Sequence, residues 1–454
     1  MRSTNIVSYS VKITNKGERT MQHNLMQRLA SAIVLLLSIL LVSACTVAVP
    51  QGGAPAQAQP ADLRFTVWIN PDHPAMVAYN EMAQAYMADH PEVASITFDT
   101  IPFGEYTSKL TLQLAGGNPP DGGWVLENTA PQFVASQVMA DLQPALNAAE
   151  GYDLADFSES ALALWKAGDG LYALPFSTSP FLILYNKDLF EAAGLEDPNA
   201  LAARGEWTWE ALAAAAKTIA ETQGVYGLEG VDGALYTSPW STLTPIVRSF
   251  GGDFWDAEGN CTMNSPETVA ALQFFHDMLF VDQSIVPPGE IGDFFTGQSA
   301  MTLGQISRLT KLDNAEFAWD VAPLPAGPVT QAATIGQAGL TIFANSPNRD
   351  IAIDFLTYLT NPENSQTMGA FFPSARRSVI NSEAFLNGNP RLSADQMKLV
   401  VAGIENGQVL PNHQNFSQID LTARAVVDKL WRADADVQAI ADEICTTIAP
   451  LLQQ

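Results

Sequence analysis

The sequence predicts a large α/β protein with two lobes. Its 454 residues, 47% of them hydrophobic, are enough to build more than one core. Along the chain, the hydrophobic period also changes repeatedly between that of a strand and that of a helix. Such alternation favours a parallel sheet with helices on both faces.

The first strands and helices follow residue 61. Alternating apolar residues predict strands at 63–69 and 96–98, and apolar residues at helical spacing predict helices at 76–86 and 106–114. The second helix should end at Gly116-Gly117, because the two prolines that follow force an extended turn.

The same pattern returns later in the chain. Phe181–Tyr185 is a continuous apolar run, as expected for a strand that is buried on both faces. An apolar stripe from Val437 to Ile448 makes the last helix amphipathic. Capping residues predict where other helices begin. The predicted caps are Thr208, Ser265 before Pro266, Ser346 before Pro347, and Ser393, which forms a capping box with Gln396.

The N-terminal segment has the features of an export signal. Arg28 precedes the apolar run Leu29–Val42, whose length of about 14 residues is too short for a bilayer and fits a signal-peptide core. The run ends in Leu41-Val42-Ser43-Ala44-Cys45, which resembles a bacterial lipobox with Cys45 as the lipidated residue. We therefore expect residues 1–45 to be a signal peptide, with residues 1–20 as extra sequence if translation starts at Met21 or Met26.

The alternative for this apolar run is a buried structural helix. The residues that follow, 46–61, disfavour a buried helix. They are rich in Pro, Gly, Gln and Ala, lack periodicity and have the composition of a flexible tether. The expected product is extracytoplasmic and held to the cell membrane by lipid on Cys45, on the periplasmic or the outer-facing side.

Two cysteines, Cys261 and Cys445, remain after Cys45. An exported chain meets an oxidising environment, in which the two thiols can form a disulfide. The alternative is two separate buried thiols, since Cys445 lies on the apolar stripe of the last helix. The sequence leaves both open.

Charge and motifs exclude several classes of function. The chain has 22 Lys and Arg against 48 Asp and Glu and no basic cluster, so we expect no nucleic-acid partner. The sequence has no GxSxG, P-loop, HExxH or CxxC motif, and we expect neither a metal nor a cofactor. The histidines that follow Cys45 have no metal-ligand spacing. They are His73, His90, His276 and His413.

Aromatic and polar residues gather where predicted strands end. Sugar sites combine aromatic rings, which pack on the apolar face of a sugar, with polar side chains that bind its hydroxyls. In open α/β sheets, ligands bind beyond the carboxyl ends of the strands. Three segments fit this description, although each aromatic could equally belong to a core. They are Trp68 with Asn70, Asp72 and His73; Trp124 with Glu127 and Asn128; and Trp240 and Trp255 around Gly251-Gly252.

A longer stretch resembles a known family. Tyr172–Phe190 contains a proline, an apolar strand and the run Tyr185-Asn186-Lys187-Asp188, and Thr208-Trp209-Glu210 starts a helix after it. These residues resemble the extracellular solute-binding proteins of carbohydrate ABC importers. Weaker matches follow in the family's order from about Leu63 to Gln454. They are Phe65–Asn70, Gly297–Thr302, Val321–Pro325, Asn345–Asn348, Pro373–Arg377 and Leu410–Asn412.

The resemblance implies the periplasmic-binding-protein fold, with two α/β lobes, a hinge and a ligand cleft between the lobes. The N-lobe would take residues 62–177 plus 341–385, and the C-lobe 178–340 plus 386–454. It also implies a monomer that binds a small carbohydrate, delivers it to ABC permease subunits and is no enzyme.

The family's polar ligand contacts fall on several positions of this chain. They are Asn70, Asp72, His73, Glu127, Asn128 and Ser179. Where maltodextrin binders have stacking tryptophans, this chain has Val125, Ser307 and Asp420, of which the last two remain candidate contacts. An aromatic platform would come from Trp240, Phe371 or Tyr106 instead. Arg308, Arg376 and Gln337 could bind hydroxyls or an anionic substrate such as a sugar phosphate, or else form surface or interlobe salt bridges.

Two other classes of function remain. A lipid-anchored carbohydrate-active enzyme, such as a glycoside hydrolase, needs only a pair of carboxylates, and 48 acidic residues leave room for such a pair. A structural or adhesive lipoprotein would not need the cleft that the resemblance implies.

Overall fold

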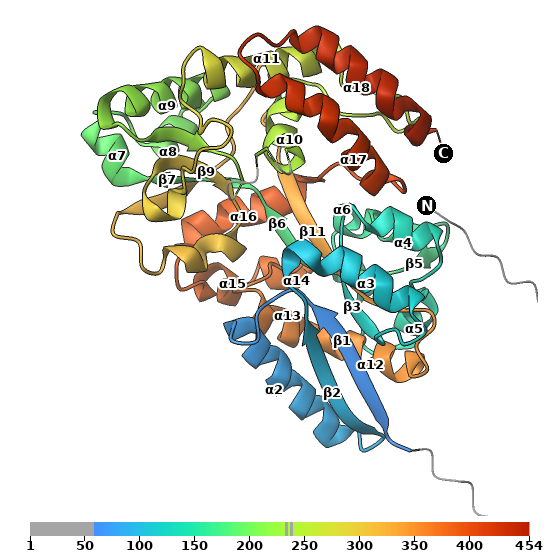
Figure 1. Cartoon of the computed structure of the whole chain (residues 1–454). Helices are drawn as coiled ribbons and strands as arrows, with labels where there is room; N and C mark the ends of the chain where they lie inside the picture. Colours follow the sequence, from blue (N-terminus) through green and yellow to red (C-terminus); the bar gives the residue numbers. More distant parts are fainter. Residues whose placement is uncertain (1–58, 232–234, 237–238, 454) are drawn as a thin grey trace, which may run out of the picture. The chain divides into compact units, whose positions relative to one another are not determined.

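The computed structural model describes residues 59–453 apart from 232–234 and 237–238 (Figure 1). The predicted signal peptide, the lipobox with Cys45 and residues 46–58 of the tether lie outside the described residues. Within the described part, no helix combines the length and apolar character needed to cross a membrane.

The first sheet is built around β1 (Ala61–Val67), with β2 (Val93–Thr100) and β3 (Gly122–Leu126) as its parallel neighbours. β11 (Thr334–Ile342) runs antiparallel to β3 and to β6 (Leu174–Pro180). The short β12 (Gln408–Val409) completes the order β12-β11-β3-β1-β2, with β6 paired to β11. Helices that pack on this sheet or lie near it are α2 (Pro74–Asp89), α3 (Tyr106–Ala115), α4 (Ala130–Ala135), α5 (Gln143–Ala148), α6 (Glu159–Ala163), α12 (Arg349–Leu359) and α13 (Pro362–Met368).

The second sheet has the order β10-β7-β9-β8. Its strands are β7 (Leu182–Asn186), β8 (Tyr226–Glu229), β9 (Ser299–Gly304) and β10 (Trp319–Ala322). β7 is antiparallel to both β9 and β10, and β8 is parallel to β9. Helices of this part are α7 (Lys187–Ala192), α8 (Pro198–Ala203), α9 (Trp209–Gln223), α10 (Trp240–Ser249), α11 (Pro266–Phe280), α17 (Phe416–Val427) and α18 (Val437–Leu452).

The expectation of a parallel sheet is therefore only partly right, since both sheets are mixed. Parallel neighbours require a crossover connection of a dozen or more residues. β11 instead enters the first sheet from β10 of the second sheet, and it runs opposite to β3 and β6.

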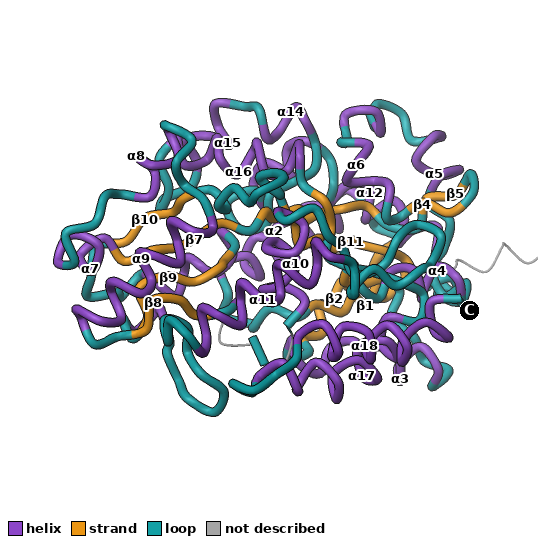
Figure 2. Tube along the Cα trace, turned by 90° about the horizontal axis from the view of Figure 1, so that it is seen from above, coloured by secondary structure: helices purple, strands orange, loops and turns teal. Residues whose placement is uncertain are grey.

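The chain passes between the two sheets at several points. Only Phe181 separates β6 of the first sheet from β7 of the second. Figure 2 shows the two groups of strands apart, β7–β10 on the left and β1, β2 and β11 on the right. A third hydrophobic core, with Leu184, Val321 and Val400, lies where the second sheet meets α14 (Arg377–Ile380), α15 (Glu383–Gly388) and α16 (Ala394–Asn406). The lobe boundaries given above remain a prediction.

Most predicted elements are confirmed, including the first two strands and helices and the amphipathic α18. Thr208 and Ser265 cap α9 and α11, and Ser393 forms the predicted capping box with Gln396.

Several boundaries differ from the prediction. The first strand was expected to reach Ile69 but ends at Val67. Ala61 was expected in the tether but starts β1, where it pairs with Val93. Phe181 precedes β7 rather than starting it. Ser346 does not cap a helix at Pro347: its hydroxyl donates to Asp121 Oδ1 (2.6 Å) and accepts from the Asn348 amide, which makes a turn, and α12 begins at Arg349.

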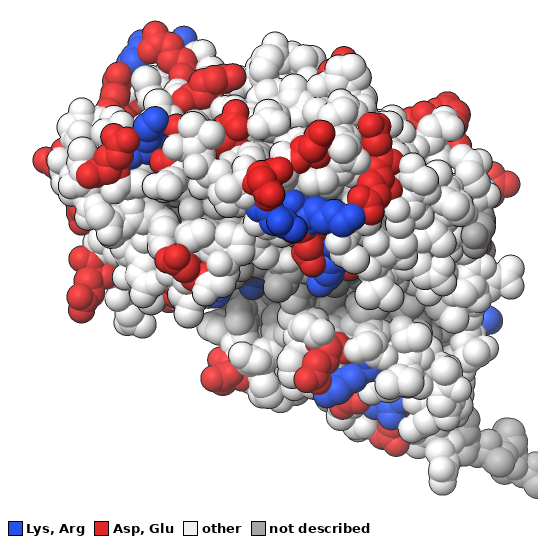
Figure 3. Space-filling view, turned by 45° about the horizontal axis from the view of Figure 1, so that its top comes forward, with Lys and Arg blue, Asp and Glu red and all other residues white. Residues whose placement is uncertain are grey.

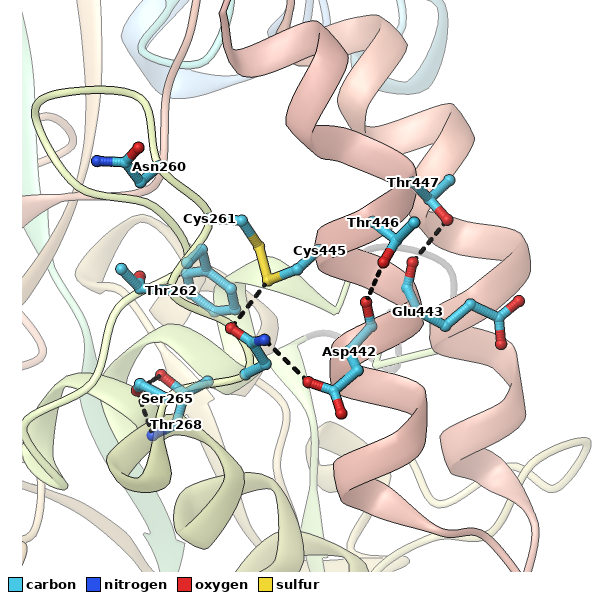
Figure 4. The surroundings of a disulfide bond; sticks show 12 residues. Asn260, Cys261, Thr262, Ser265, Thr268, Asp442, Glu443, Cys445, Thr446 and Thr447 are labelled. Atoms are coloured by element: carbon cyan, nitrogen blue, oxygen red, sulfur yellow. Dashed lines mark hydrogen bonds between the residues drawn. A yellow bond between two sulfur atoms is a disulfide. The ribbon is translucent and has the colours of Figure 1, made fainter.

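Cys261 and Cys445 form a disulfide, so the alternative of two separate thiols is wrong in this structure. The bond joins the loop before α11 to the last helix, α18 (Figure 4). Close by, the Asn264 side-chain amide donates to Asp442 Oδ1 of the same helix (2.9 Å). The disulfide and this hydrogen bond thus help to hold the loop against α18, and the Gln453 side chain at the end of the helix donates to the Gly259 carbonyl of the same loop (2.9 Å).

Candidate ligand-binding cleft

A cavity of about 580 Å³ is lined by residues from both sheets. Cavities of ~300–1,000 Å³ are typical of small-molecule sites. The first sheet contributes residues 68–70 after β1, Glu127 after β3 and Gln337 of β11. The 3₁₀ helix η5 (Ile306–Leu312), which follows β9 of the second sheet, contributes residues 306–308, 310 and 311, and Gln305 precedes them. Residues 370–372, Asn389 and Arg391 also line the cavity.

Aromatic rings form the apolar part of this wall. Trp68 packs edge-on against the buried rings of Tyr106 and Trp124, with ring centroids 5.0 and 4.7 Å away. These contacts fix the Trp68 ring at the cavity. Phe103 lies against Trp68 and remains 52% exposed, so an apolar face is open to a ligand.

Glu127 provides a buried carboxyl group. Its Oε2 accepts a hydrogen bond from the Gln337 amide (3.1 Å), and its own amide donates to the Gln337 carbonyl (3.2 Å). Burial raises the pKa of Glu127 to about 7, although hydrogen bonds to the carboxyl from the backbone amides of Glu127 and Gln337 act in the opposite direction. Near neutral pH this carboxyl can therefore donate a hydrogen bond in its neutral form or accept two or more in its charged form.

His73 is fixed as a neutral donor. Its Nδ1 accepts from the Ala75 amide (3.1 Å) and caps α2, so the ring proton is on Nε2. The pKa of His73 is lowered, mainly because the ring is partly buried. The charge of Asp72 acts to raise this pKa, and the charge of Arg391 acts to lower it. The imidazole packs near Phe371 and Phe372, with centroids 5.8 and 6.3 Å away, and lines the cavity.

Eight of the residues expected at the site line this cavity. They are Asn70, His73, Glu127, Ser179, Ser307, Arg308, Gln337 and Phe371. The Gln337 side chain is already bonded within the protein, because its Oε1 accepts from Trp165 Nε1 (2.9 Å) and its Nε2 donates to Thr178 (3.2 Å).

Six other residues expected at the site do not line the cavity. They are Asp72, Tyr106, Asn128, Trp240, Arg376 and Asp420. Tyr106 is 1% exposed, and its hydroxyl donates to the Thr66 carbonyl (2.9 Å), so it supports Trp68 from behind. Trp240 is buried in the hydrophobic core that packs on the second sheet, and its indole donates to the partly exposed Asp420 (2.7 Å), which also pairs with Arg424. Asp72 is exposed, and Asn128 accepts from Thr129.

Arg376 is a structural residue of the core. Its guanidinium carbon lies 4.6 and 4.3 Å from the ring centroids of Tyr152 and Phe157, and the side chain is fully buried. Its nitrogens donate to the Thr360 and Asp153 carbonyls and to Asp156. The arginine therefore joins the loop before α14 to residues 152–157 instead of contacting a ligand.

Several cavity residues were missed as site residues. Among them are Trp68, Phe103, Ser177, Phe181, Gln305, Lys311, Phe372, Asn389 and Arg391. Trp68 carried a usable signal, since it stands at the end of a predicted strand. Arg391 carried none, because its place depends on the Nε–Oδ1 and Nη2–Oδ2 contacts with Asp313 (2.6 and 2.7 Å), which lies 78 residues away.

A family model described as "Bacterial extracellular solute-binding protein" matches residues 70–366. The arabinooligosaccharide-binding protein of Halalkalibacterium halodurans is 24% identical over 299 residues, which cover 63% of this chain and 63% of that protein. The mannitol-binding protein of Pseudomonas aeruginosa is 24% identical over 369 residues, covering 76% and 79%.

A solved structure shares the fold. The ABC substrate-binding protein from Listeria monocytogenes in complex with cycloalternan has a TM-score of 0.74 at 22% identity, covering 86% of this chain and 98% of that one. The predicted two-lobed α/β fold is thereby confirmed. Because the family model covers more than half of the sequence, the chain belongs to the bacterial extracellular solute-binding protein family.

Proposed function

We propose that this protein captures a small carbohydrate in the cavity and delivers it to the permease of an ABC importer. The observation that carries the proposal is the composition of the cavity wall, in which aromatic rings lie beside a buried carboxyl and a neutral histidine donor. Sugars present an apolar C–H face and a ring of hydroxyls, and this wall offers partners to both.

Two relatives support this ligand class by name. One is described as arabinooligosaccharide-binding and one as mannitol-binding, while the Listeria structure contains cycloalternan. All three are described as binding proteins, which favours reversible capture over turnover.

Capture is proposed to involve closure of two lobes about a hinge. The proposed N-lobe takes residues 62–177 plus 341–385, and the C-lobe 178–340 plus 386–454. Cavity residues come from both sets: Trp68 and Glu127 from one, Arg308 and Arg391 from the other. A ligand that contacts both sets binds the closed form better and shifts the population toward it.

Export and lipid attachment at Cys45 complete the proposal, on the basis of the apolar run and the lipobox-like residues Leu41–Cys45. In a bacterial host, the wild-type chain should fractionate with membranes and a Cys45→Ser variant should not. Equal membrane fractions for the two chains would contradict anchoring at Cys45.

A thermal-shift screen of residues 59–454 against mono- and oligosaccharides tests the function. A ligand at 100 times its Kd should add about 2.7 kcal/mol to the free energy of unfolding. Chromatography of the recovered ligand should show it intact. Stabilisation by no carbohydrate, or hydrolysis of the one that binds, would contradict the proposal.

A further inference from the structure

Part of the cavity wall is the surface of the first sheet itself, where β6 and β11 present small residues. The two strands are antiparallel neighbours, and residues directly opposite each other in such a pair share one face of the sheet. Two opposite pairs line the cavity, and they are Ser177 with Ala338 and Ser179 with Gly336. A hollow crosses the face of the molecule that Figure 3 shows, with charged side chains along its edges, whereas these four residues carry no charge. Because their side chains are small, a ligand can come close to the sheet here.

The Ser179 hydroxyl lacks a hydrogen-bond partner. The residue is 2% exposed, and its Oγ makes no hydrogen bond within the part of the chain that the structure describes. A buried hydroxyl without a partner lowers stability, and an alanine would avoid that cost. Rotation about a single side-chain bond moves the Oγ between staggered positions, so the hydroxyl can turn toward a ligand in the cavity. A serine at this position is explained if the ligand supplies the partner.

The Gln305 side chain lies beside Ser179 and also lines the cavity. Its Nε2 donates to the Ser179 carbonyl (2.8 Å). Among the described residues this amide makes no other hydrogen bond, so its second N–H and its oxygen are left for a ligand. A Cβ at position 336 would lie 2.5 Å from Nε2, closer than real Cβ contacts allow, so Gly336 makes room for the amide.

Ser179 and Gln305 belong to different sheets. Ser179 is part of β6 in the first sheet, and Gln305 directly follows β9 of the second. A ligand group that binds both residues therefore contacts both sheets at once, as the proposed closure requires.

We propose that Ser179 and Gln305 form a subsite, beside Gly336, for one hydroxyl group of the bound carbohydrate. The inference rests on the proposed function and narrows its ligand class to carbohydrates that present a hydroxyl at this position. A sugar hydroxyl can accept from the free N–H of Gln305 and exchange a second hydrogen bond with the Ser179 Oγ. A site that binds a hydroxyl discriminates strongly against the analogue that lacks it, because its own polar groups are then left unpaired.

Isothermal titration calorimetry with glucose, galactose, mannose, arabinose, maltose and mannitol selects the probe, which is the compound that binds tightest. Ser179→Ala and Gln305→Met should each lower the affinity for this probe at least fivefold, because each removes one partner of the bound hydroxyl. Ser179→Ala should nevertheless unfold at the same or a higher urea concentration than wild type, since it removes an unpaired buried hydroxyl. A serine with a merely structural role would not combine these two results.

Thr334→Val is the matched control. The Thr334 hydroxyl is also buried and has no hydrogen-bond partner among the described residues, but Thr334 does not line the cavity. The affinity of this variant for the probe should stay within about twofold of wild type.

Forms of the probe that each lack one hydroxyl identify the group that is bound. One of them should bind wild type at least tenfold weaker than the probe itself, and Ser179→Ala should reduce this ratio at least threefold, since the two changes remove the same interaction.

The outcomes separate the inference from the function on which it rests. Wild-type affinity in either Ser179→Ala or Gln305→Met, an equal loss in Thr334→Val, or an unchanged ratio in Ser179→Ala would overturn the inference alone. Lack of binding by every compound of the panel would contradict the proposed function and the inference with it.

Discussion

Trp68 and Trp240 show how little the identity of a residue says about its place in a site. Both follow the rule of an aromatic near a strand end or glycine turn, and Trp240 was the one expected to stack on a sugar. In the structure, Trp68 lines the cavity, while Trp240 is 5% exposed in the hydrophobic core of the second sheet and its indole donates to Asp420. The sequence could not distinguish the roles of the two tryptophans, because Asp420, the partner of Trp240, lies 180 residues away.

The two tryptophans form a matched pair of variants. Trp68→Leu should weaken carbohydrate binding at least tenfold, about 1.4 kcal/mol, because the ring that faces the sugar is removed. Trp240→Leu should leave the affinity within about twofold and lower the free energy of unfolding, by less than the ~3–5 kcal/mol typical of a buried Trp→Ala change. Calorimetry and urea denaturation measure the two effects. An affinity lost in the Trp240 variant and kept in the Trp68 variant would reverse the assignment.

Glu127 gives a prediction about pH. Burial raises its pKa from 4.5 to about 7 in the folded chain, so the folded carboxyl keeps its proton to higher pH than the unfolded one. Unfolding then releases a proton between about pH 4.5 and 7, and the free energy of unfolding falls as pH rises through this window. At about 1.4 kcal/mol per pKa unit, the full contribution is up to about 3 kcal/mol.

Glu127→Gln removes this titration and keeps an oxygen that can accept from the Gln337 amide. Relative to wild type, the variant should gain stability as the pH of urea denaturation rises from 5 to 8. Contributions of the other carboxylates cancel in the difference. A stability difference that does not change with pH would show that Glu127 titrates normally.

Among the helices and strands, local signals were sufficient wherever the relevant contacts are local. Hydrophobic period and caps located α2, α9, α11 and α18, because a cap acts within three residues of the helix it starts. The helix cap predicted at Ser346 was wrong because the contact that decides its role is not local. Its hydroxyl is bonded to Asp121, 225 residues away, and the helix starts later. The prediction of a parallel sheet was only partly right for a similar reason, because the direction of each strand depends on where the chain crosses between the sheets.

The disulfide between the loop at Cys261 and α18 closes a loop of 184 residues. Closing a loop of this size restricts the unfolded chain, and we expect a Cys261→Ser, Cys445→Ser double variant to lose about 2–5 kcal/mol of unfolding free energy. Neither sulfur lies in the cavity lining, so the affinity for carbohydrate should stay within about twofold. Urea denaturation and calorimetry of the double variant measure both. Unchanged stability would mean that the bond adds nothing to the fold, and a large loss of affinity would link α18 to the site.

At the scale of the whole molecule, the site is assembled from segments far apart in the sequence. Residues near 70, 127, 180, 308, 337, 371 and 391 meet at one cavity because the chain passes repeatedly between the two sheets. The resemblance of Tyr185–Asp188 to a known family supplied the architecture, and it pointed to cavity residues that follow strands of the first sheet, such as Asn70 and Glu127. The aromatic Phe372 and the cations Lys311 and Arg391 stand on connecting segments with no local signal, so only the tertiary structure reveals them.

The most direct test of the central claim, that this cavity binds carbohydrate, is the tryptophan fluorescence of residues 59–454 during titration with the carbohydrate that stabilises them most. Trp68 lines the cavity, so the account predicts a saturable spectral change that a Trp68→Phe variant loses. A response that stays unchanged in this variant, or no saturable response to any carbohydrate, would contradict the account.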